Sequence, residues 1–112
     1  DTTKACFFVT GNNDTASLWS EEHKTIVKKI PESLILEIDN NKIGIIHGHQ
    51  FGRHQPDHKL LRNKFEECRL VIYGHTHKQI VDNQHSPWVI NPGASGKIRT
   101  RGGVSCLLLN IK

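Results

Sequence analysis

The fold is indicated most clearly by the stretch Leu70-Val71-Ile72-Tyr73-Gly74-His75-Thr76-His77. Its first four residues are aliphatic or aromatic, which is typical of a short buried strand, and two histidines follow closely. The same order occurs earlier in the chain, in Lys42-Ile43-Gly44-Ile45-Ile46-His47-Gly48-His49. Because parallel sheets carry their chemistry at the carboxyl ends of their strands, we expect both histidine pairs to lie at one edge of a sheet.

A third apolar run, Cys6–Thr10, ends in Gly11-Asn12-Asn13-Asp14 and would bring an amide oxygen to the same edge. A metal ion that activates water needs neutral imidazoles, oxygen donors and an open coordination position. His75 and His77 can aim their imidazoles at neighbouring points, because they share one face of an extended segment. Such a mixed set of nitrogen and oxygen donors suits Mn²⁺, Fe or Zn²⁺. The remaining histidines, which lie in polar surroundings and are interpreted as surface residues, are His23, His54, His58 and His85.

Strands outnumber helices after residue 30, which favours a single α/β (α+β) domain over residues 1–112, built as a layered sandwich. Asp39-Asn40-Asn41 is expected to join two strands as a hairpin, since Asp and Asn tolerate the turn geometry. Helices are expected from Pro56 to about Cys68, with apolar residues on one face, and from Glu21 to Ile30. The expected strands are Ala5–Thr10, Leu34–Ile38, Lys42–Ile46, Leu70–Tyr73, Gln79–Val81, Trp88–Ile90 and Val104–Ile111.

Length and composition exclude several classes of protein. The 112 residues are enough for one domain with its own core. No apolar run approaches the roughly 18 residues of a membrane helix, and no basic-then-apolar leader precedes a cleavage site, so no membrane partner is expected. Nucleic-acid binding is not indicated, because no basic patch with interleaved aromatic residues occurs. The cysteines Cys6, Cys68 and Cys106 are widely spaced. This favours free core thiols and a reducing, cytoplasmic compartment.

Four motifs, taken together, resemble those of the calcineurin-like metallophosphoesterases. They occur in the family's order and span the chain from about Ala5 onward. The resemblance is greatest to the small bacterial and archaeal phosphodiesterases and to the retromer subunit of the same fold. It implies an αββα sandwich with a two-metal site at the strand ends. The motifs are Gly11-Asn12-Asn13-Asp14, Ile46-His47-Gly48-His49, Gly74-His75-Thr76-His77 and Asn91-Pro92-Gly93-Ala94-Ser95.

The resemblance also implies a set of metal ligands. Asn12, His47 and His75 would hold one divalent metal ion, and His77 would belong to the other. Mn²⁺ is the expected metal, with Zn²⁺, Fe or Ni²⁺ as alternatives. The implied reaction is hydrolysis of a phosphate-ester small molecule, of the phosphodiester type, by metal-activated hydroxide.

Two further residues take catalytic roles by the same resemblance. His49 would either orient the site by contacting a ligand or protonate a leaving group. Asp14 would fix a neighbouring side chain or balance the metal charge, and the alternative is a cap of a helix or turn. Many family members have a histidine at the position of Asn13, and an amide cannot act as a general acid.

The family's opening Asp-x-His and Gly-Asp motifs have no counterpart in this sequence. We therefore expect an N-terminally truncated sandwich that lacks its first βαβ unit. Two functions stay open on these grounds. One is a metal-dependent phosphoesterase, impaired or inactive as this short chain, and the other is a non-catalytic scaffold that binds proteins, like the retromer subunit. An exposed sheet edge would favour pairing into a homo-oligomer.

Overall fold

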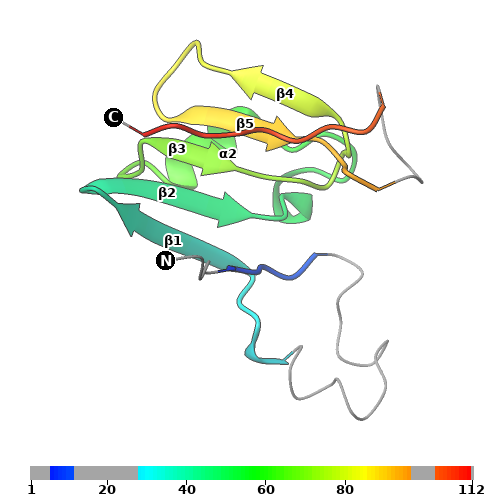
Figure 1. Ribbon diagram of the computed structural model, residues 1–112, viewed down its shortest axis with the longest axis horizontal. Coiled ribbons are helices and arrows are strands. Elements are labelled where there is room, and N and C mark those ends of the chain that lie inside the picture. Colours follow the sequence, from blue (N-terminus) through cyan, green and yellow to red (C-terminus); the bar gives the residue numbers. More distant parts are fainter. Residues whose placement is uncertain (1–5, 12–27, 97–102, 112) are drawn as a thin grey trace.

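The computed structural model describes residues 6–11, 28–96 and 103–111. Within these residues the chain forms one five-stranded mixed sheet with the strand order β1-β2-β3-β5-β4 (Figure 1). The three central strands run parallel, and each outer strand is antiparallel to its neighbour. The predicted α/β class is confirmed, and of the two sheets of an αββα sandwich the described residues form one. The strands are β1 (Ser33–Ile38), β2 (Asn41–Ile46), β3 (Leu70–Ile72), β4 (Gln79–Asp82) and β5 (Trp88–Pro92).

The predicted hairpin joins β1 to β2. Asp39 and Asn40 both have left-handed backbone, with φ values of 50° and 66°. Ile38 pairs directly with Asn41 across the turn. Two central residues with positive φ match the right-handed twist of the flanking strands, and Asp and Asn adopt this conformation more readily than other side chains. The hairpin is therefore encoded locally.

The helix α2 (His58–Lys64) is shorter than the predicted Pro56–Cys68 helix. It begins after Asp57, whose carboxylate accepts hydrogen bonds from the backbone N–H groups of Lys59 and Leu60 at 2.9 and 3.3 Å. Pro56 thus precedes the cap instead of occupying the first helical turn. The helix ends where Phe65 leaves the helical region, with φ −113° and ψ 41°.

One face of the sheet packs against α2 and carries the larger core. Gly44 of β2 faces the ring of Phe65, and a Cβ at this position would clash with that ring. A side chain on Gly44 would push the helix away from the sheet. The predicted apolar face of the helical region is buried here, as expected. The buried cluster consists of Ile46, Leu61, Phe65, Cys68, Val71, Tyr73 and Val89.

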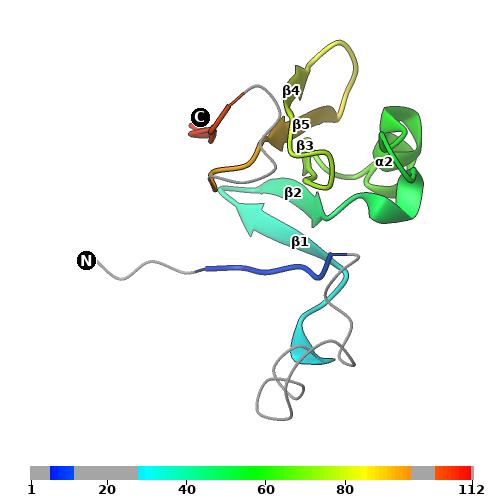
Figure 2. The ribbon, with the colours of Figure 1, turned by 90° about the vertical axis from the view of Figure 1, so that its right-hand side faces the viewer.

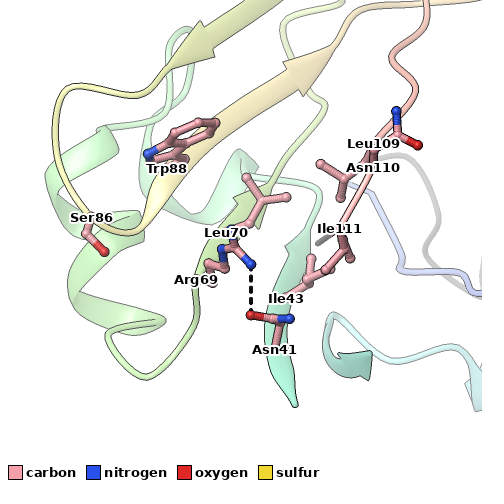
Figure 3. A pocket seen from close by; sticks show the side chains of 9 residues that line it. All are labelled: Asn41, Ile43, Arg69, Leu70, Ser86, Trp88, Leu109, Asn110 and Ile111. Carbon is pink, nitrogen blue, oxygen red and sulfur yellow. Dashed lines mark hydrogen bonds between the residues drawn. The ribbon is translucent and has the colours of Figure 1, made fainter. Parts of the chain in front are cut away.

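The C-terminal segment 103–111 crosses the opposite face of the sheet (Figure 2). This face has a smaller buried cluster of Ile43, Leu70 and Ile90, against which Ile111 packs. A cavity of about 390 Å³ lies between this face and the segment, near Trp88 (Figure 3).

Two predicted strands are not formed. The segment 105–111 has no strand conformation, although the N–H of Ser105 donates to Ala94 O at 2.9 Å. Residues 6–10, the described part of the predicted Ala5–Thr10 strand, likewise have none. Apolar sequence alone does not make a strand, because the backbone also needs a strand edge to pair with. Cys6 and Cys106 are accordingly exposed, and only Cys68 is the buried thiol that we expected.

The predicted Glu21–Ile30 helix lies largely outside the described residues, of which Lys28 and Lys29 are helical. In the part of the chain that the structure covers, no helix has the length and apolar character needed to cross a membrane.

Candidate metal centre

Three imidazole rings meet at the carboxyl ends of two neighbouring strands. His47 follows β2, and His75 follows β3, which pairs with β2 in parallel. The ring centroids of His47 lie 5.2 Å from those of both His49 and His75, and the last two are 6.3 Å apart. The N–H of Gly74 donates to His47 O at 3.0 Å and ties the two strand ends together. The structure therefore brings both histidine motifs to one edge of the sheet, as the sequence predicts.

The backbone at His75 and His77 is left-handed, with φ values of 45° and 60°. The extended segment that we expected for these two histidines is therefore not formed. Non-glycine residues adopt this region at a cost on the order of 1–3 kcal/mol, so surrounding contacts must hold them there. The Nε2–H of His75 donates to Arg53 O at 2.7 Å. In the neutral ring, Nδ1 then keeps the lone pair. Metal-binding histidines show this arrangement, in which one ring nitrogen donates to a carbonyl and the other faces the metal.

His47 and His49 contact each other through their Nδ1 atoms, which are 3.1 Å apart. One ring must donate and the other accept. With His47 as the donor, its Nε2 keeps the lone pair on the side where Gly11 lies, since a Cβ built on Gly11 would be 3.0 Å from that Nε2. Gly48 makes the sharp turn between the two histidines, with φ 104°.

The contact of Gly11 with His47 brings the third motif to the same edge, because Gly11 is the first residue of Gly11-Asn12-Asn13-Asp14. The predicted ligand Asn12 and the predicted catalytic Asp14 lie outside the described residues. His77 is partly buried and is not one of the three rings that contact each other.

The side chain of Asn91 fixes the loop Gly74–His77 by hydrogen bonds. The sequence did not indicate this role. The Asn91 side chain is completely buried, and its Nδ2 donates to Gly74 O at 2.5 Å and to Thr76 Oγ1 at 2.9 Å. Its Oδ1 accepts from the N–H of Gly93 at 2.9 Å. A buried amide with every polar atom paired fixes one geometry. The signal in the sequence is a polar residue two positions after Val89, on the inward face of β5.

His58 is the histidine whose interpretation needs correction. It is not a surface residue, because its side chain is 18% exposed and its Nδ1 donates to Asp82 Oδ2 at 2.7 Å. Arg62 also contacts Asp82, at 2.9 Å. The hydrogen bond from His58, followed by that from Arg62, lowers the pKa of Asp82 to about 2. Sequence reasoning missed this cluster because Asp82 lies 24 residues after His58 in the chain.

The donor set fits a metal ion in its chemistry, since neutral imidazoles at one sheet edge are ligands for Mn²⁺, Fe or Zn²⁺. It does not form a complete site by itself. Within residues 6–11, 28–96 and 103–111, no three His, Cys, Asp or Glu side chains are arranged to hold one ion. A further oxygen ligand is needed, and the amide that follows Gly11 in the sequence is the predicted one.

Comparisons with known proteins identify the fold and the family. The chain superposes on Vps29 from Entamoeba histolytica, crystallised with Zn²⁺, with a TM-score of 0.52 and 28% identity over 60% of this chain and 38% of Vps29. An archaeal phosphodiesterase matches with a TM-score of 0.51 and 30% identity, over 78% of this chain and 52% of that protein. A predicted phosphoesterase from Streptococcus pneumoniae, 24% identical, shares the fold with a TM-score of 0.58 over 87% and 49% of the two chains.

The chain thus spans between about two fifths and one half of the length of these solved structures. No curated protein matches it. Residues 2–112 match the calcineurin-like phosphoesterase superfamily domain. The order of the motifs, the mixed sheet and the histidines at its edge agree with that match, and the chain belongs to the calcineurin-like phosphoesterase superfamily.

Proposed function

We propose that this chain carries the metal-binding part of a phosphoesterase that hydrolyses phosphodiesters. The observation that carries the proposal is the state of His75. Its Nε2–H donates to Arg53 O at 2.7 Å, so the other nitrogen of the neutral ring keeps the lone pair, and the ring lies 5.2 Å from that of His47. The left-handed backbone of His75 supports the proposal, because strained non-glycine residues cluster at functional sites.

In this proposal Asn12, His47 and His75 hold one divalent ion, and His77 contributes to a second. The bound ions would supply Lewis acidity toward the phosphoryl oxygens and would lower the pKa of a water molecule. Mn²⁺ remains the expected metal, and Zn²⁺ is the natural second choice because the Vps29 crystal contained it.

The chain's own residues orient these groups. The Nδ1 contact at 3.1 Å supports His49 as a residue that fixes the ring of His47, rather than as the general acid. Asn13 cannot donate a proton as an acid, which favours phosphodiesters with good leaving groups over monoesters. Asp14 would balance the metal charge.

The test is hydrolysis of bis(p-nitrophenyl) phosphate by the purified chain, with Mn²⁺ and with Zn²⁺. We expect metal-dependent turnover in the wild type and a loss of at least about a hundredfold in His75→Ala, as for an outright loss of a ligand. His85→Ala is the matched control, because His85 is an exposed histidine away from the ring cluster. Activity that survives His75→Ala would show that the site is wrong.

The second candidate is a non-catalytic, protein-binding scaffold. It is favoured by the incomplete ligand set of the described residues and by the likeness to Vps29. The two functions separate in one measurement. A scaffold would show no turnover of the phosphodiester with either ion, whereas the enzyme would show turnover that depends on the metal. We also propose that the chain forms a homo-oligomer by pairing through an exposed edge of the sheet. Sedimentation of the purified chain measures its oligomeric state.

A further inference from the structure

A chain of polar side chains runs beneath the histidine edge, on the α2 side of the sheet. Gln55 Nε2 donates to Tyr73 OH at 3.0 Å. Tyr73 OH lies 2.9 Å from His58 Nε2, and His58 Nδ1 lies 2.7 Å from Asp82 Oδ2. The carboxylate of Asp82 also forms an ion pair with Arg62 at 2.9 Å. These five residues come from the loop before α2, the helix itself, β4 and the end of β3.

The chemistry of the end groups sets the direction of the protons. The carboxylate of Asp82 can only accept, so His58 Nδ1 carries a hydrogen. A neutral His58 then accepts at Nε2, and the phenol of Tyr73 donates to it. Tyr73 in turn accepts from Gln55. Gln55 Nε2 also lies 3.4 Å from His58 Nε2, so the amide contacts both members of the tyrosine–histidine pair. With a neutral His58, the direction of each hydrogen bond follows from the one before it.

Tyr73 connects this polar chain to the predicted metal ligands. Its side chain is 1% exposed, and it directly precedes Gly74 and His75. Its ring also lies against the turn between His47 and His49, since a Cβ on Gly48 would be 3.2 Å from Tyr73 Cδ2. The phenol is therefore packed beside both histidine motifs.

The loop that carries His49 is fastened at two places by these contacts. Gln55 is held by the Tyr73 hydroxyl, and Arg53 O accepts from His75 Nε2. Loss of the Gln55–Tyr73 hydrogen bond would therefore loosen the loop that carries the Arg53 carbonyl. The position of the Arg53 carbonyl decides which nitrogen of His75 carries the proton.

We propose that Tyr73, His58 and Asp82 are positioning residues that fix the loop of Arg53 and Gln55 and thereby the ring of His75. The part of this proposal that concerns metal affinity rests on the proposed function. The part that concerns the loop and the strand end does not. A tyrosine that only filled the core would need its ring and not its hydroxyl.

The test uses Tyr73→Phe, which keeps the ring and removes the hydroxyl. Amide hydrogen exchange of the metal-free protein compares two amides at opposite ends of β3. The Gly74 N–H is bonded to His47 O at 3.0 Å, and the Arg69 N–H is bonded to Lys42 O at 2.8 Å. We expect Gly74 to exchange about tenfold faster in the variant and Arg69 to stay unchanged. Equal acceleration of both amides, or none in either, would overturn the positioning role.

The matched control is Phe65→Leu, because Phe65 lies in the same core cluster and makes no polar contact with the histidine edge. A loss of core packing alone should accelerate both amides together. A second pair of variants tests the far end of the polar chain. Asp82→Asn keeps an oxygen that accepts from His58 and should keep the protection of Gly74, whereas Asp82→Ala should lose it as Tyr73→Phe does. The same result for Asn and Ala would contradict the proposal.

Calorimetric titration with Mn²⁺ and with Zn²⁺ tests the consequence for the site. The dissociation constant should rise about tenfold in Tyr73→Phe, the lower end of what loss of a group that orients a ligand produces. An unchanged constant would overturn the link to the metal. If the wild type binds neither ion, the proposed function fails, and the exchange of Gly74 still decides the positioning role.

Discussion

The two faces of the sheet differ in how far the chain itself covers them. On the α2 face, the side chains of Phe65, Tyr73 and Val89 are almost completely buried. On the opposite face, Trp88 is 50% exposed, and Leu109 in the crossing segment is 43% exposed. The cavity of about 390 Å³ opens between these two residues and Arg69 (Figure 3). Helix α2 packs along the sheet and excludes water from the side chains beneath it. The segment 103–111 does not pair with the sheet as a strand and covers the opposite face less completely.

This difference also separates the chemistry from the open surface. The histidine edge is held from the α2 side, through Asn91 and Tyr73. The open face is lined at its cavity by the first residues of the parallel strands, Leu70 and Trp88, which lie at the other end of the sheet. Side chains on the α2 face should therefore contribute more to the free energy of unfolding than side chains on the open face. The following variants test this difference.

Phe65→Ala should cause the largest loss of stability. Phe65 is 2% exposed and fills the space above Gly44, so its removal leaves a cavity between helix and sheet. We expect the free energy of unfolding to fall by about 3–5 kcal/mol, measured by urea denaturation. Phe65→Leu should recover a large part of this loss. A loss below about 1 kcal/mol in Phe65→Ala would contradict the assignment of the main core to the α2 face.

Acid should weaken the α2 face by an intermediate amount through Asp82. Its pKa is lowered from the ordinary 3.8 to about 2, chiefly by the hydrogen bond from His58. A lowered pKa stabilises the fold above pH 4, and the contribution is lost as the pH falls from about 4 to about 2. Since the side chain is 24% exposed, we expect about 1 kcal/mol.

Urea denaturation at several pH values measures this loss. Asp82→Asn is the control, because it carries no titrating group and should flatten the slope between pH 4 and 2. The idea fails if the wild type and the variant lose stability in parallel over this range.

Leu109→Ala should cause the smallest change, because Leu109 is already 43% exposed at the open cavity. We expect a loss under about 1 kcal/mol, since only part of the side chain is removed from water in the native state. Thermal unfolding followed by circular dichroism is sufficient to measure it. A loss as large as that of Phe65→Ala would show that the two faces are equally packed.

Local features of the fold could be predicted because the residues that decide them are neighbours in the chain. Asp39 and Asn40 tolerate positive φ, so the hairpin appears where expected. The apolar runs that became β2, β3 and β5 were likewise found within one or two residues. The Val104–Ile111 run failed, because whether an apolar run forms a strand depends on a partner edge elsewhere.

In the candidate site, too, the sequence indicated some residues and only the fold revealed the others. The histidines were found from their places after apolar runs, and the parallel pairing of β2 with β3 puts His47 beside His75. The supporting residues were not found. Asn91 belongs to a motif with Pro and Gly, and His58 lies among polar residues in the sequence. The fold buries Asn91 completely and His58 in large part.

By itself, the sequence determined the family, the β1–β2 hairpin and the histidines that follow the central strands, because motif spacing and apolar periodicity are properties of adjacent residues. Only the tertiary structure decided how those ends are held. The proton on His75 Nε2 is set by Arg53 O, and the loop of Arg53 is tied through Tyr73 to His58 and Asp82. These partners come from separate elements, and hydrogen bonds between them exist only after the sheet and helix have packed.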